Sequence, residues 1–201
     1  MGRELYRLEE QLAARGIRYI AGVDEVGRGP LAGPVAAGAV ILPPGFYLAE
    51  LVDSKKLSPG RRKRLAVQIM EKSLAWAVGW ASVLEIDCLN IAVASRLAMQ
   101  RAVAGLAITP EHILVDAFYL PGINIPQTPL IAGDNLSASI AAAAILAKVA
   151  RDKLMEDYDR VFPGYGFGRH KGYPTREHRA ALAALGPTPI HRHSFRLKGV
   201  R

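Results

Sequence analysis

Two adjacent acids interrupt an otherwise apolar, strand-like run near the start of the chain. Asp24 and Glu25 follow residues 19–23 and precede residues 27–30, which are rich in glycine and proline. A carboxylate inside a low-dielectric strand is costly or takes up a proton, unless a cation, hydrogen bonds or water reach it. Successive strand residues point to opposite faces, so both acids can serve one site only where the strand ends or bulges. We therefore expect the strand to break at this pair.

Two further acids lie at the ends of apolar elements. Asp116 ends the apolar run 112–115, and Asp134 precedes a long helical pattern. Strand ends in such sheets are where sites form. A set of carboxylates without histidine or cysteine partners is typical of a hard divalent ion, and Mg²⁺ or Mn²⁺ fits best. Two such ions suit phosphodiester cleavage, because one activates a water while the other stabilises the leaving oxygen.

Each acid also has a purely structural interpretation. Asp134 could cap the helix that follows it, and Asp116 could close a turn. Glu25 could pair with Arg28, three residues along the chain. The recurrence of the same placement at several positions favours one shared site over these separate explanations.

The patterns around the acids predict alternating strands and helices. Strands are expected at residues 18–26, 33–42, 75–84 and 112–116, and helices at residues 3–15, 58–72, 89–106 and 137–159. Ser58 followed by proline is a helix start, and the first half of the last helix is almost all alanine, which lets it approach a sheet closely. This order implies an α/β or α+β layer fold.

Length and composition bound the class of protein. A chain of 201 residues, half of them apolar, suffices for a single domain over residues 1–201. No basic-then-apolar leader opens the chain, and the low-charge helical run 138–147 is far shorter than the roughly 20 residues that cross a bilayer. We expect a cytoplasmic protein without membrane association. Cys88 is the only cysteine, so an intrachain disulfide and a thiolate zinc cluster are excluded.

The net charge of +8 is concentrated near the C-terminus. Residues 148–201 carry 12 basic and 5 acidic side chains, and residues 1–147 carry 14 and 13. Aromatic residues and four of the five histidines fall in the same basic region, a combination that suggests a nucleic-acid backbone. We expect residues 160–201 to be a helical and loop segment that binds substrate. A solvated surface is the alternative, and the pair His191 and His193 is interpreted as surface decoration rather than a metal site.

Basic residues also crowd the start of the predicted helix 58–72. The run 61–64 is Arg-Arg-Lys-Arg, which opposes the helix dipole. This favours contact with phosphates over a purely structural role. Other ligand motifs are absent from the sequence: residues 27–33 fail the spacing of a dinucleotide-binding loop, and neither a P-loop nor a G-x-S-x-G elbow occurs.

Four motifs in order resemble bacterial ribonuclease HII. They are AGVDEVGRGPLAGPV at 21–35, DSKKLS at 53–58, GDNLSASIAAAAILAKVARD at 133–152 and YGFGRHKGYPTREH at 165–178. The resemblance implies an RNase H-like fold, a mixed five-stranded β-sheet flanked by helices with a small C-terminal helical segment. By the same resemblance, Asp24, Glu25, Asp116 and Asp134 match the family's catalytic carboxylates, which hold two Mg²⁺ or Mn²⁺ ions.

The resemblance also implies a substrate and the residues that recognise it. Gly27, Arg28 and Gly29 match the family's Gly-Arg-Gly stretch, which recognises a ribose 2′-OH, and Tyr173 matches the tyrosine that stacks beneath the next, DNA sugar. Glycines allow close backbone approach, and the 2′-OH is the group that separates RNA from DNA. The expected partners are RNA/DNA hybrids and DNA duplexes containing ribonucleotides. The expected products carry 3′-hydroxyl and 5′-phosphate ends, and we expect a monomer without an obligate protein partner.

Two departures from the family pattern concern contacts near the acids. Ala132 stands where relatives often have lysine, and Ala144 where serine is common, so a phosphate contact and a helix hydroxyl are in doubt. Ribonuclease HIII fits less well, because it usually adds an N-terminal domain and a Gly-Lys-Gly motif. Alternatives from other classes are a non-catalytic binder of hybrids or duplexes and a junction resolvase. A cluster of acids beside a polyanion speaks against the first, since it is repulsive without divalent ions.

Overall fold

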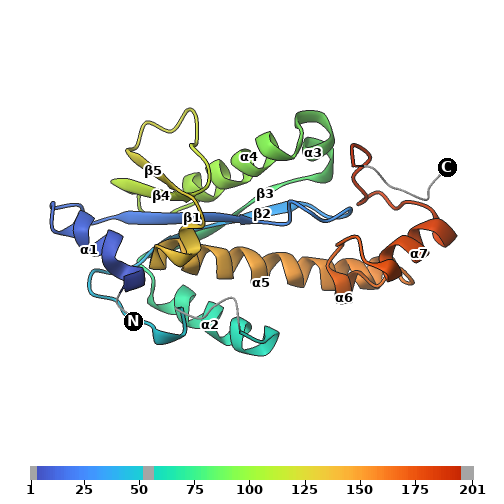
Figure 1. The fold of residues 1–201 in the computed structure, drawn as a ribbon, viewed down its shortest axis with the longest axis horizontal. Helices are drawn as coiled ribbons and strands as arrows, with labels where there is room; N and C mark the ends of the chain where they lie inside the picture. Colours follow the sequence, from blue (N-terminus) through green and yellow to red (C-terminus); the bar gives the residue numbers. More distant parts are fainter. Residues whose placement is uncertain (1–3, 52–56, 196–201) are drawn as a thin grey trace.

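A computed structural model describes residues 4–51 and 57–195. Its sheet consists of β1 (Ile20–Val26), β2 (Val35–Ile41), β3 (Ala75–Ala81), β4 (His112–Asp116) and β5 (Gln127–Leu130), in the spatial order β3-β2-β1-β4-β5 (Figure 1). The pairs β1–β2 and β2–β3 are antiparallel, and the pairs β1–β4 and β4–β5 are parallel. The predicted mixed five-stranded sheet is confirmed.

Helices cover both faces of this sheet. They are η1 (Glu4–Tyr6), α1 (Arg7–Ala13), η2 (Ala49–Leu51), α2 (Pro59–Lys72), α3 (Val83–Leu89), α4 (Ile91–Ala104), η4 (Gly133–Asn135), α5 (Ala138–Val161), α6 (Phe167–His170) and α7 (Arg176–Leu185). Figure 1 shows α3 and α4 on one side of the sheet and α2 and α5 on the other, with α6 and α7 beyond the sheet at the far end of α5. The structure is therefore layered around the sheet, with a small helical segment at the C-terminal end.

The long helix α5 lies unusually close to the sheet. A Cβ atom added to Gly22 on β1 would overlap the backbone of Ser139, and one added to Gly38 on β2 would overlap the backbone of Ala143. Ser137 caps the helix by accepting a hydrogen bond from the amide of Ile140 at 3.2 Å. The alanine-rich first half therefore permits the close approach that its composition predicted.

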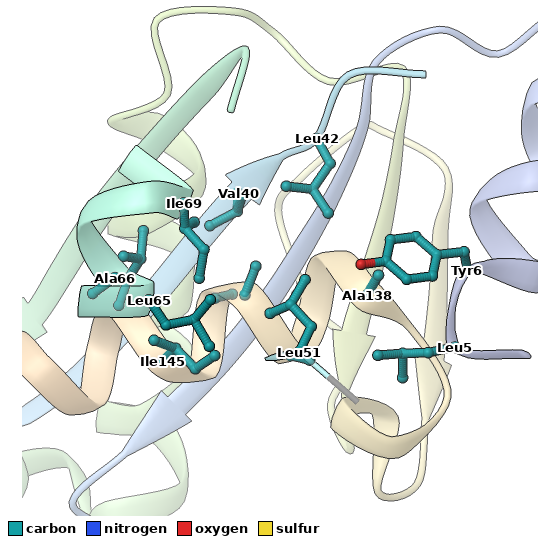
Figure 2. Packing of buried hydrophobic residues seen from close by; sticks show 14 residues of the cluster. Leu5, Tyr6, Val40, Leu42, Leu51, Leu65, Ala66, Ile69, Ala138 and Ile145 are labelled. Atoms are coloured by element: carbon teal, nitrogen blue, oxygen red, sulfur yellow. The ribbon is translucent and has the colours of Figure 1, made fainter. Parts of the chain in front are cut away.

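Hydrophobic clusters on the two faces hold these layers together. On the α5 side, η1, β2, α2 and α5 share a cluster that includes Tyr6, Val40, Leu65 and Ile145 (Figure 2). On the other side, α4 packs against β1, β2 and β4 through a second cluster. Both faces are buried because each carries its own helix layer, so β1 and β2 are almost continuously apolar.

Three elements differ from the sequence prediction. β3 ends at Ala81 rather than residue 84, because Ser82 and Glu85 form a capping box that starts α3. Asn90 adopts a φ of 69° and separates α3 from α4, so the predicted helix 89–106 begins at residue 91. β5 was not predicted, since it contains Pro129; as an edge strand it tolerates a residue without an amide donor.

The acid pair does not break its strand, contrary to expectation. β1 continues through Val26, and its ladder with β2 pairs Asp24 with Gly38 and Glu25 with Ala37. Among the described residues, no helix has both the length and the hydropathy needed to cross a membrane. The division of the chain into one domain with a substrate-binding segment at 160–201 stays a prediction.

Candidate active site

Strand pairing brings two of the predicted acids together. The parallel ladder between β1 and β4 pairs Val23 with Val115. The next residue on each strand is an acid, Asp24 on β1 and Asp116 on β4. Two positions far apart in the sequence thus become neighbours at the carboxyl ends of parallel strands, where sites in such sheets form.

Glu25 joins this pair from the same strand. One carboxylate oxygen from each of Asp24, Glu25 and Asp116 lies within 4.8 Å of the others. β1 does not break at the acids as we expected; instead it stops pairing with β4 while it continues to pair with β2. The β1–β4 ladder stops at Val23, whereas the β1–β2 ladder continues to Val26, so the β4 side of β1 is open beside Glu25.

Asp134 lies next to this trio but outside the 4.8 Å group formed by the described residues. It belongs to the short helix η4, whose Gly133 amide donates to Oδ1 of Asp116 at 2.6 Å. A side chain at Gly133 would press against Ile140 and Asp116, so glycine allows η4 to lie this close. The charge of Asp134 is near enough to help raise the pKa of Asp24.

The electrostatics of the cluster leave negative charge uncompensated. Burial raises the pKa of Asp24 well above its ordinary value, and the charges of Glu25 and Asp116 add to this effect. Burial also raises the pKa of Glu25, against the opposing effect of Arg28. Within the described part of the chain, Oε2 of Glu25 is buried without a hydrogen-bond partner. Carboxylate oxygens with an orphaned acceptor fit a hard divalent cation such as Mg²⁺ or Mn²⁺.

The predicted recognition residues follow directly after the acids. Arg28 is about half exposed, pairs with Glu25 at 3.3 Å, and its guanidinium lies 4.8 Å from the ring centre of Phe118. The structural interpretation of Glu25 as the partner of Arg28 is therefore realised, and the pair links the acid cluster to residues 27–33, here called the glycine loop. Gly27 needs its glycine because its φ is 95° and the side chain of Arg151 fills the space of a Cβ.

Tyr173 reaches the same loop from the C-terminal region. A Cβ on Gly29 would lie 3.5 Å from Cε1 of Tyr173, so the two predicted recognition positions are adjacent. The tyrosine is 40% exposed, so it is not a core aromatic. Its neighbour Gly172 also contacts the loop, since the amide of Leu31 donates to the Gly172 carbonyl at 2.8 Å.

A buried arginine that sequence reasoning missed holds the glycine loop. Arg192 is fully buried, and its guanidinium donates to four carbonyl groups of the loop. The acceptors are Gly27 at 2.6 Å, Arg28 at 3.0 Å, Pro30 at 2.8 Å and Gly33 at 2.9 Å. The planar fork of arginine supplies these donors in a fixed arrangement. In a basic tail, no local signal distinguishes such an arginine from a solvated one.

Arg151 of α5 supports the loop from the opposite direction. It is fully buried and donates to the carbonyls of Pro34 at 2.9 Å, Ala32 at 3.1 Å and Lys171 at 3.0 Å. The last contact joins the glycine loop to the segment that carries Tyr173. The two arginines therefore fix the loop by its backbone. Gly27 and Gly33 are buried, and Gly29 is the glycine of this loop that is exposed to an approaching ligand.

One of the two tail histidines is wrongly predicted. His191 is fully buried rather than surface decoration, and its ring packs against Tyr165 and Phe167. His193 is exposed, as expected. The error arises because burial of a short polar segment depends on what other elements cover it, which local composition does not encode.

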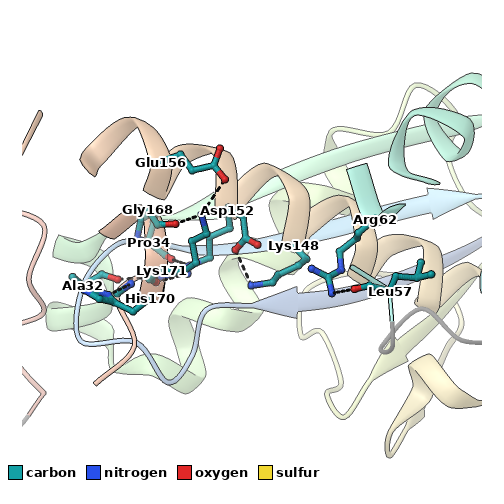
Figure 3. Close-up of polar contacts among 12 residues, drawn as sticks. Ala32, Pro34, Leu57, Arg62, Lys148, Asp152, Glu156, Gly168, His170 and Lys171 are labelled. Atoms are coloured by element: carbon teal, nitrogen blue, oxygen red, sulfur yellow. Dashed lines mark hydrogen bonds and ion pairs between the residues drawn. The ribbon is translucent and has the colours of Figure 1, made fainter. Parts of the chain in front are cut away.

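The basic first turn of α2 lies against the end of α5. Arg62 donates to the backbone carbonyl of Leu57 just before its helix, and Lys171 contacts Glu156 at 3.0 Å (Figure 3). Lys63 also pairs with Glu156, at 3.4 Å. These charged residues line a pocket of about 250 Å³. The phosphate-contacting role stays a prediction, and most of the motif at 53–58 lies outside the described residues. Of the two positions that depart from the family pattern, Ala132 is exposed with a φ of 54°, and Ala144 is partly buried on α5.

The larger described pocket is remote from this chemistry. It measures about 770 Å³ and is lined by residues such as Tyr6, Phe46 and Tyr47, without any of the four acids. A long polymer substrate needs an extended surface rather than an enclosed cavity, so the chemistry, not the pocket volume, identifies the site.

Comparison with known proteins bears on the same region. The family model "Ribonuclease HII" matches residues 21–198. A ribonuclease HII of Moorella thermoacetica is 64% identical over 192 residues, which is 96% of this chain and 93% of that protein. A ribonuclease HII of Desulfitobacterium hafniense is 56% identical over 191 residues, which is 95% of this chain and 74% of that protein.

Solved structures agree with the fold. The chain is similar to the ribonuclease H2 of Pyrococcus horikoshii OT3, with a TM-score of 0.73 and 25% identity, covering 89% of this chain and 94% of that one. It is also similar to the ribonuclease HII in the PCNA:RNase HII complex of Archaeoglobus fulgidus, with a TM-score of 0.73 and 25% identity, covering 87% of this chain and 92% of that one. Because a family model spans nearly the whole chain and curated bacterial relatives match over its length, this protein belongs to the ribonuclease HII family and is a ribonuclease H that acts on RNA/DNA hybrids.

Proposed function

We propose that this ribonuclease also incises duplex DNA on the 5′ side of an embedded ribonucleotide, leaving 3′-hydroxyl and 5′-phosphate ends. The observation that carries the proposal is the continuity of two groups of residues. The ion pair between Glu25 and Arg28 connects the acid cluster to the glycine loop, in which Gly29 lies next to Tyr173. A cutting site and a site suited to a ribose are therefore within one short stretch of backbone.

Asp24, Glu25, Asp116 and Asp134 would hold two Mg²⁺ or Mn²⁺ ions. The orphaned Oε2 of Glu25 and the raised pKa of Asp24 support this assignment, since both express a lack of positive charge. When bound, divalent ions would lower the pKa of an attacking water and offset charge on the leaving oxygen. The buried strands supply rigid positions for Asp24 and Asp116, and Gly133 fixes the second of these through its amide.

The glycine loop and Tyr173 would select the ribonucleotide. Gly29 is exposed and has no side chain, so a 2′-OH can approach its backbone closely, while the buried Gly27 allows the turn that places Gly29 there. Tyr173 offers a partly exposed ring beside Gly29, suited to stacking beneath the neighbouring sugar. Arg28, on the same loop, would hold a phosphate of the substrate.

The deciding experiment compares two duplexes that differ in one sugar. Purified protein is incubated with Mg²⁺ or Mn²⁺ and either an all-DNA duplex or the same duplex with one ribonucleotide. We expect incision 5′ of the ribonucleotide in the second duplex alone. A long RNA/DNA hybrid serves as the activity control: cleavage of the hybrid without incision at the single ribonucleotide would refute the proposal.

Variants separate cutting from recognition in the same assay. Asp134→Asn should lower the incision rate by at least about 100-fold with the fold retained, because it removes one charge from a site where metal interactions are worth several kcal/mol. Arg28→Ala should raise KM more than it lowers kcat, because it removes substrate holding. Wild-type turnover in the first variant, or a pure kcat loss in the second, would contradict these roles.

The surroundings of the enzyme are part of the same proposal. We infer a cytoplasmic monomer without an obligate protein partner, because DNA is the substrate and the site residues all come from one chain. The Archaeoglobus fulgidus protein forms a complex with PCNA. Light scattering of the purified protein tests the monomer, and full activity at nanomolar concentration tests the absence of an obligate partner.

A further inference from the structure

Three histidines that the proposed mechanism does not use form a buried cluster that contacts the backbone of Tyr173. The rings of His170 and His178 stack with their centres 4.4 Å apart, and the ring of His191 lies 5.2 Å from that of His178. His178 and His191 are fully buried. Buried polar rings of this kind need hydrogen-bond partners, and the partners determine which nitrogen of each ring carries a proton.

His178 holds the backbone of Tyr173 directly. Its Nδ1 lies 2.9 Å from the Tyr173 carbonyl, which only accepts, so Nδ1 carries the proton and donates. The amide of Thr175 donates to the same carbonyl at 2.8 Å, and the amide of Tyr173 donates to the carbonyl of His170 at 2.9 Å. Both polar groups of the Tyr173 backbone are therefore hydrogen-bonded to residues 170–178.

His191 completes the chain of hydrogen bonds. Its Nδ1 accepts from the amide of Thr188 at 2.8 Å, so its Nε2 carries the proton. That Nε2 lies 3.1 Å from Nε2 of His178, which is free to accept because its own proton is on Nδ1. Each contact is satisfied when both rings are neutral, and an added proton on either ring would place two donors face to face.

The His191 end of this hydrogen-bonded series is attached to the glycine loop. Ala32 forms an isolated bridge with His191, and the amide of Gly33 donates to the Ile190 carbonyl at 2.8 Å. The next residue, Arg192, is the one whose guanidinium holds the loop carbonyls. The His178–His191 hydrogen bond thus connects the backbone of Tyr173, through His178, to residues 190–192, which pair with the glycine loop.

We propose that His178 and His191 are positioning residues, which set Tyr173 in register with the glycine loop and thereby sharpen recognition of a ribonucleotide. This inference rests on the proposed function, because it assumes that Tyr173 and the loop contact one substrate. Neither histidine touches the reacting atoms. Their effect passes through the Tyr173 carbonyl on one side and through the backbone of residues 190–192 on the other.

The environment favours the neutral rings that this arrangement requires. Burial is the main cause that lowers the pKa of His178, and it lowers the pKa of His191 to about 4. The other titratable or charged groups that face the pair are His170, Arg179, His193 and Tyr165. The cationic and histidine groups among them oppose protonation of the pair, so the hydrogen-bonded chain persists at neutral pH.

Two isosteric amides at position 178 test the role. In His178→Asn the amide nitrogen lies where Nδ1 was, so the donor to the Tyr173 carbonyl is kept. In His178→Gln it lies where Nε2 was, so that donor is lost. His178→Asn keeps the donor to Tyr173 but loses the acceptor for Nε2 of His191, so we expect it to lower kcat/KM for the single-ribonucleotide duplex by up to about 3-fold. We expect His178→Gln to lower it about 10-fold, chiefly through KM. Equal losses in the two variants would overturn the proposal.

A double-mutant cycle shows whether the effect passes through the tyrosine. In a Tyr173→Ala background, His178→Gln should change kcat/KM by less than about 2-fold, because the group that it positions is gone. If the fold-losses in kcat/KM from the two substitutions multiply in the double variant, His178 has a purely structural role and positioning is refuted. His193→Gln, at an exposed histidine of the same segment, is the matched control and should behave as wild type.

A spectroscopic measurement guards against variants that fail to fold. Long-range ¹H–¹⁵N correlation of the wild-type imidazoles should show a proton on Nδ1 of His178 and on Nε2 of His191 at pH 7. The opposite tautomer on either ring would overturn the inference without any variant. Failure of the wild-type protein to incise the single-ribonucleotide duplex would instead refute the proposed function, and this inference with it. If the wild type incises this duplex but the effects of His178→Gln and Tyr173→Ala on kcat/KM are independent, only the positioning role is refuted.

Discussion

At the scale of single residues, the site contains buried charged groups whose burial costs free energy. Asp24 and Glu25 are acids with raised pKa values, and Glu25 keeps one buried oxygen unpaired among the described residues. Arg192 lies fully buried nearby, with its donors used on backbone carbonyls rather than on these acids. Negative charge therefore stays available for a cation, while the buried positive charge is used to shape the loop.

The acid cluster predicts a change in stability that does not depend on turnover. Mn²⁺ should raise the Tm of the wild type, because binding at 100 times Kd stabilises the folded state by about 2.7 kcal/mol. In Asp24→Asn we expect less than about a quarter of this shift, and a Tm without metal that is equal to or above that of wild type, since a buried repulsion is removed. Differential scanning fluorimetry measures both. Asp157→Asn, at an exposed ion pair, is the control, and an unchanged Mn²⁺ shift in Asp24→Asn would contradict the ligand assignment.

The buried guanidinium predicts a strong penalty for a nominally conservative change. Lysine has three donors on one atom and lacks the fork that reaches four carbonyls, so Arg192→Lys leaves buried acceptors unpaired. We expect a loss of about 3 kcal/mol in the free energy of unfolding, measured in urea. Arg169→Lys, at an exposed ion pair, should cost less than about 0.5 kcal/mol. Similar small losses at both positions would show that the loop contacts contribute little.

At the scale of elements, close contact between α5 and the sheet sets the position of the acids. Gly22 lies two residues before Asp24 on β1, and the backbone of Ser139 on α5 occupies the space beside it. η4 directly precedes α5 and carries Asp134. Any displacement of α5 from the sheet would therefore move the loop of Asp134 away from the strand of Asp24.

This packing predicts that one methyl group is poorly tolerated. Gly22→Ala should lower the free energy of unfolding by about 3 kcal/mol or more, because the new Cβ overlaps backbone that cannot rotate away. Gly60→Ala, within α2 and with open space around it, should be neutral or stabilising by up to about 1 kcal/mol. Urea unfolding of both variants provides the comparison. Equal stabilities would mean that α5 can move away from the sheet at little cost.

At the scale of the whole molecule, the C-terminal region packs at the far end of α5 and returns to contact the glycine loop. Residues 190–192 pair with the glycine loop, and α6 packs against α5. This region contains the buried histidines and much of the positive charge, so under the proposed function its stability and its response to pH would affect recognition of the substrate. If these charges contact a nucleic-acid backbone, as proposed, binding will weaken as the ionic strength rises.

The buried histidines predict how stability depends on pH. The pKa of His191 is lowered from 6.5 to about 4, mainly by burial, so the unfolded chain takes up the proton first as the pH falls. This contribution to stability is fully present above pH 6.5 and is lost between about pH 6.5 and 4. Wild type should lose roughly 2 kcal/mol more than His191→Gln between pH 7.5 and 4.5. Urea unfolding at the two pH values tests this, with His193→Gln as the control; parallel losses in wild type and His191→Gln would contradict it. The comparison removes the opposing effect of Asp24, whose raised pKa favours the folded state as pH falls.

Local sequence was sufficient for elements whose signals are local. The cap at Ser58, the alanine-rich start of α5 and the apolar runs of β1 and β2 depend on near neighbours, and they lie where they were predicted. β5 and the separation of α3 from α4 were missed, because an edge strand needs its partner and the left-handed Asn90 gives little local signal.

The sequence by itself determined the family and the longer strands and helices. Motif order and residue chemistry are properties of the chain, and they are sufficient to predict the four acids and the Gly-Arg-Gly stretch as site residues. Only the tertiary structure decided that β1 continues past its acids, that Asp134 lies outside the tight trio, and that Arg192 and His191 are buried. These facts depend on contacts between residues far apart in sequence, because burial and distance are set by the elements that pack over a side chain.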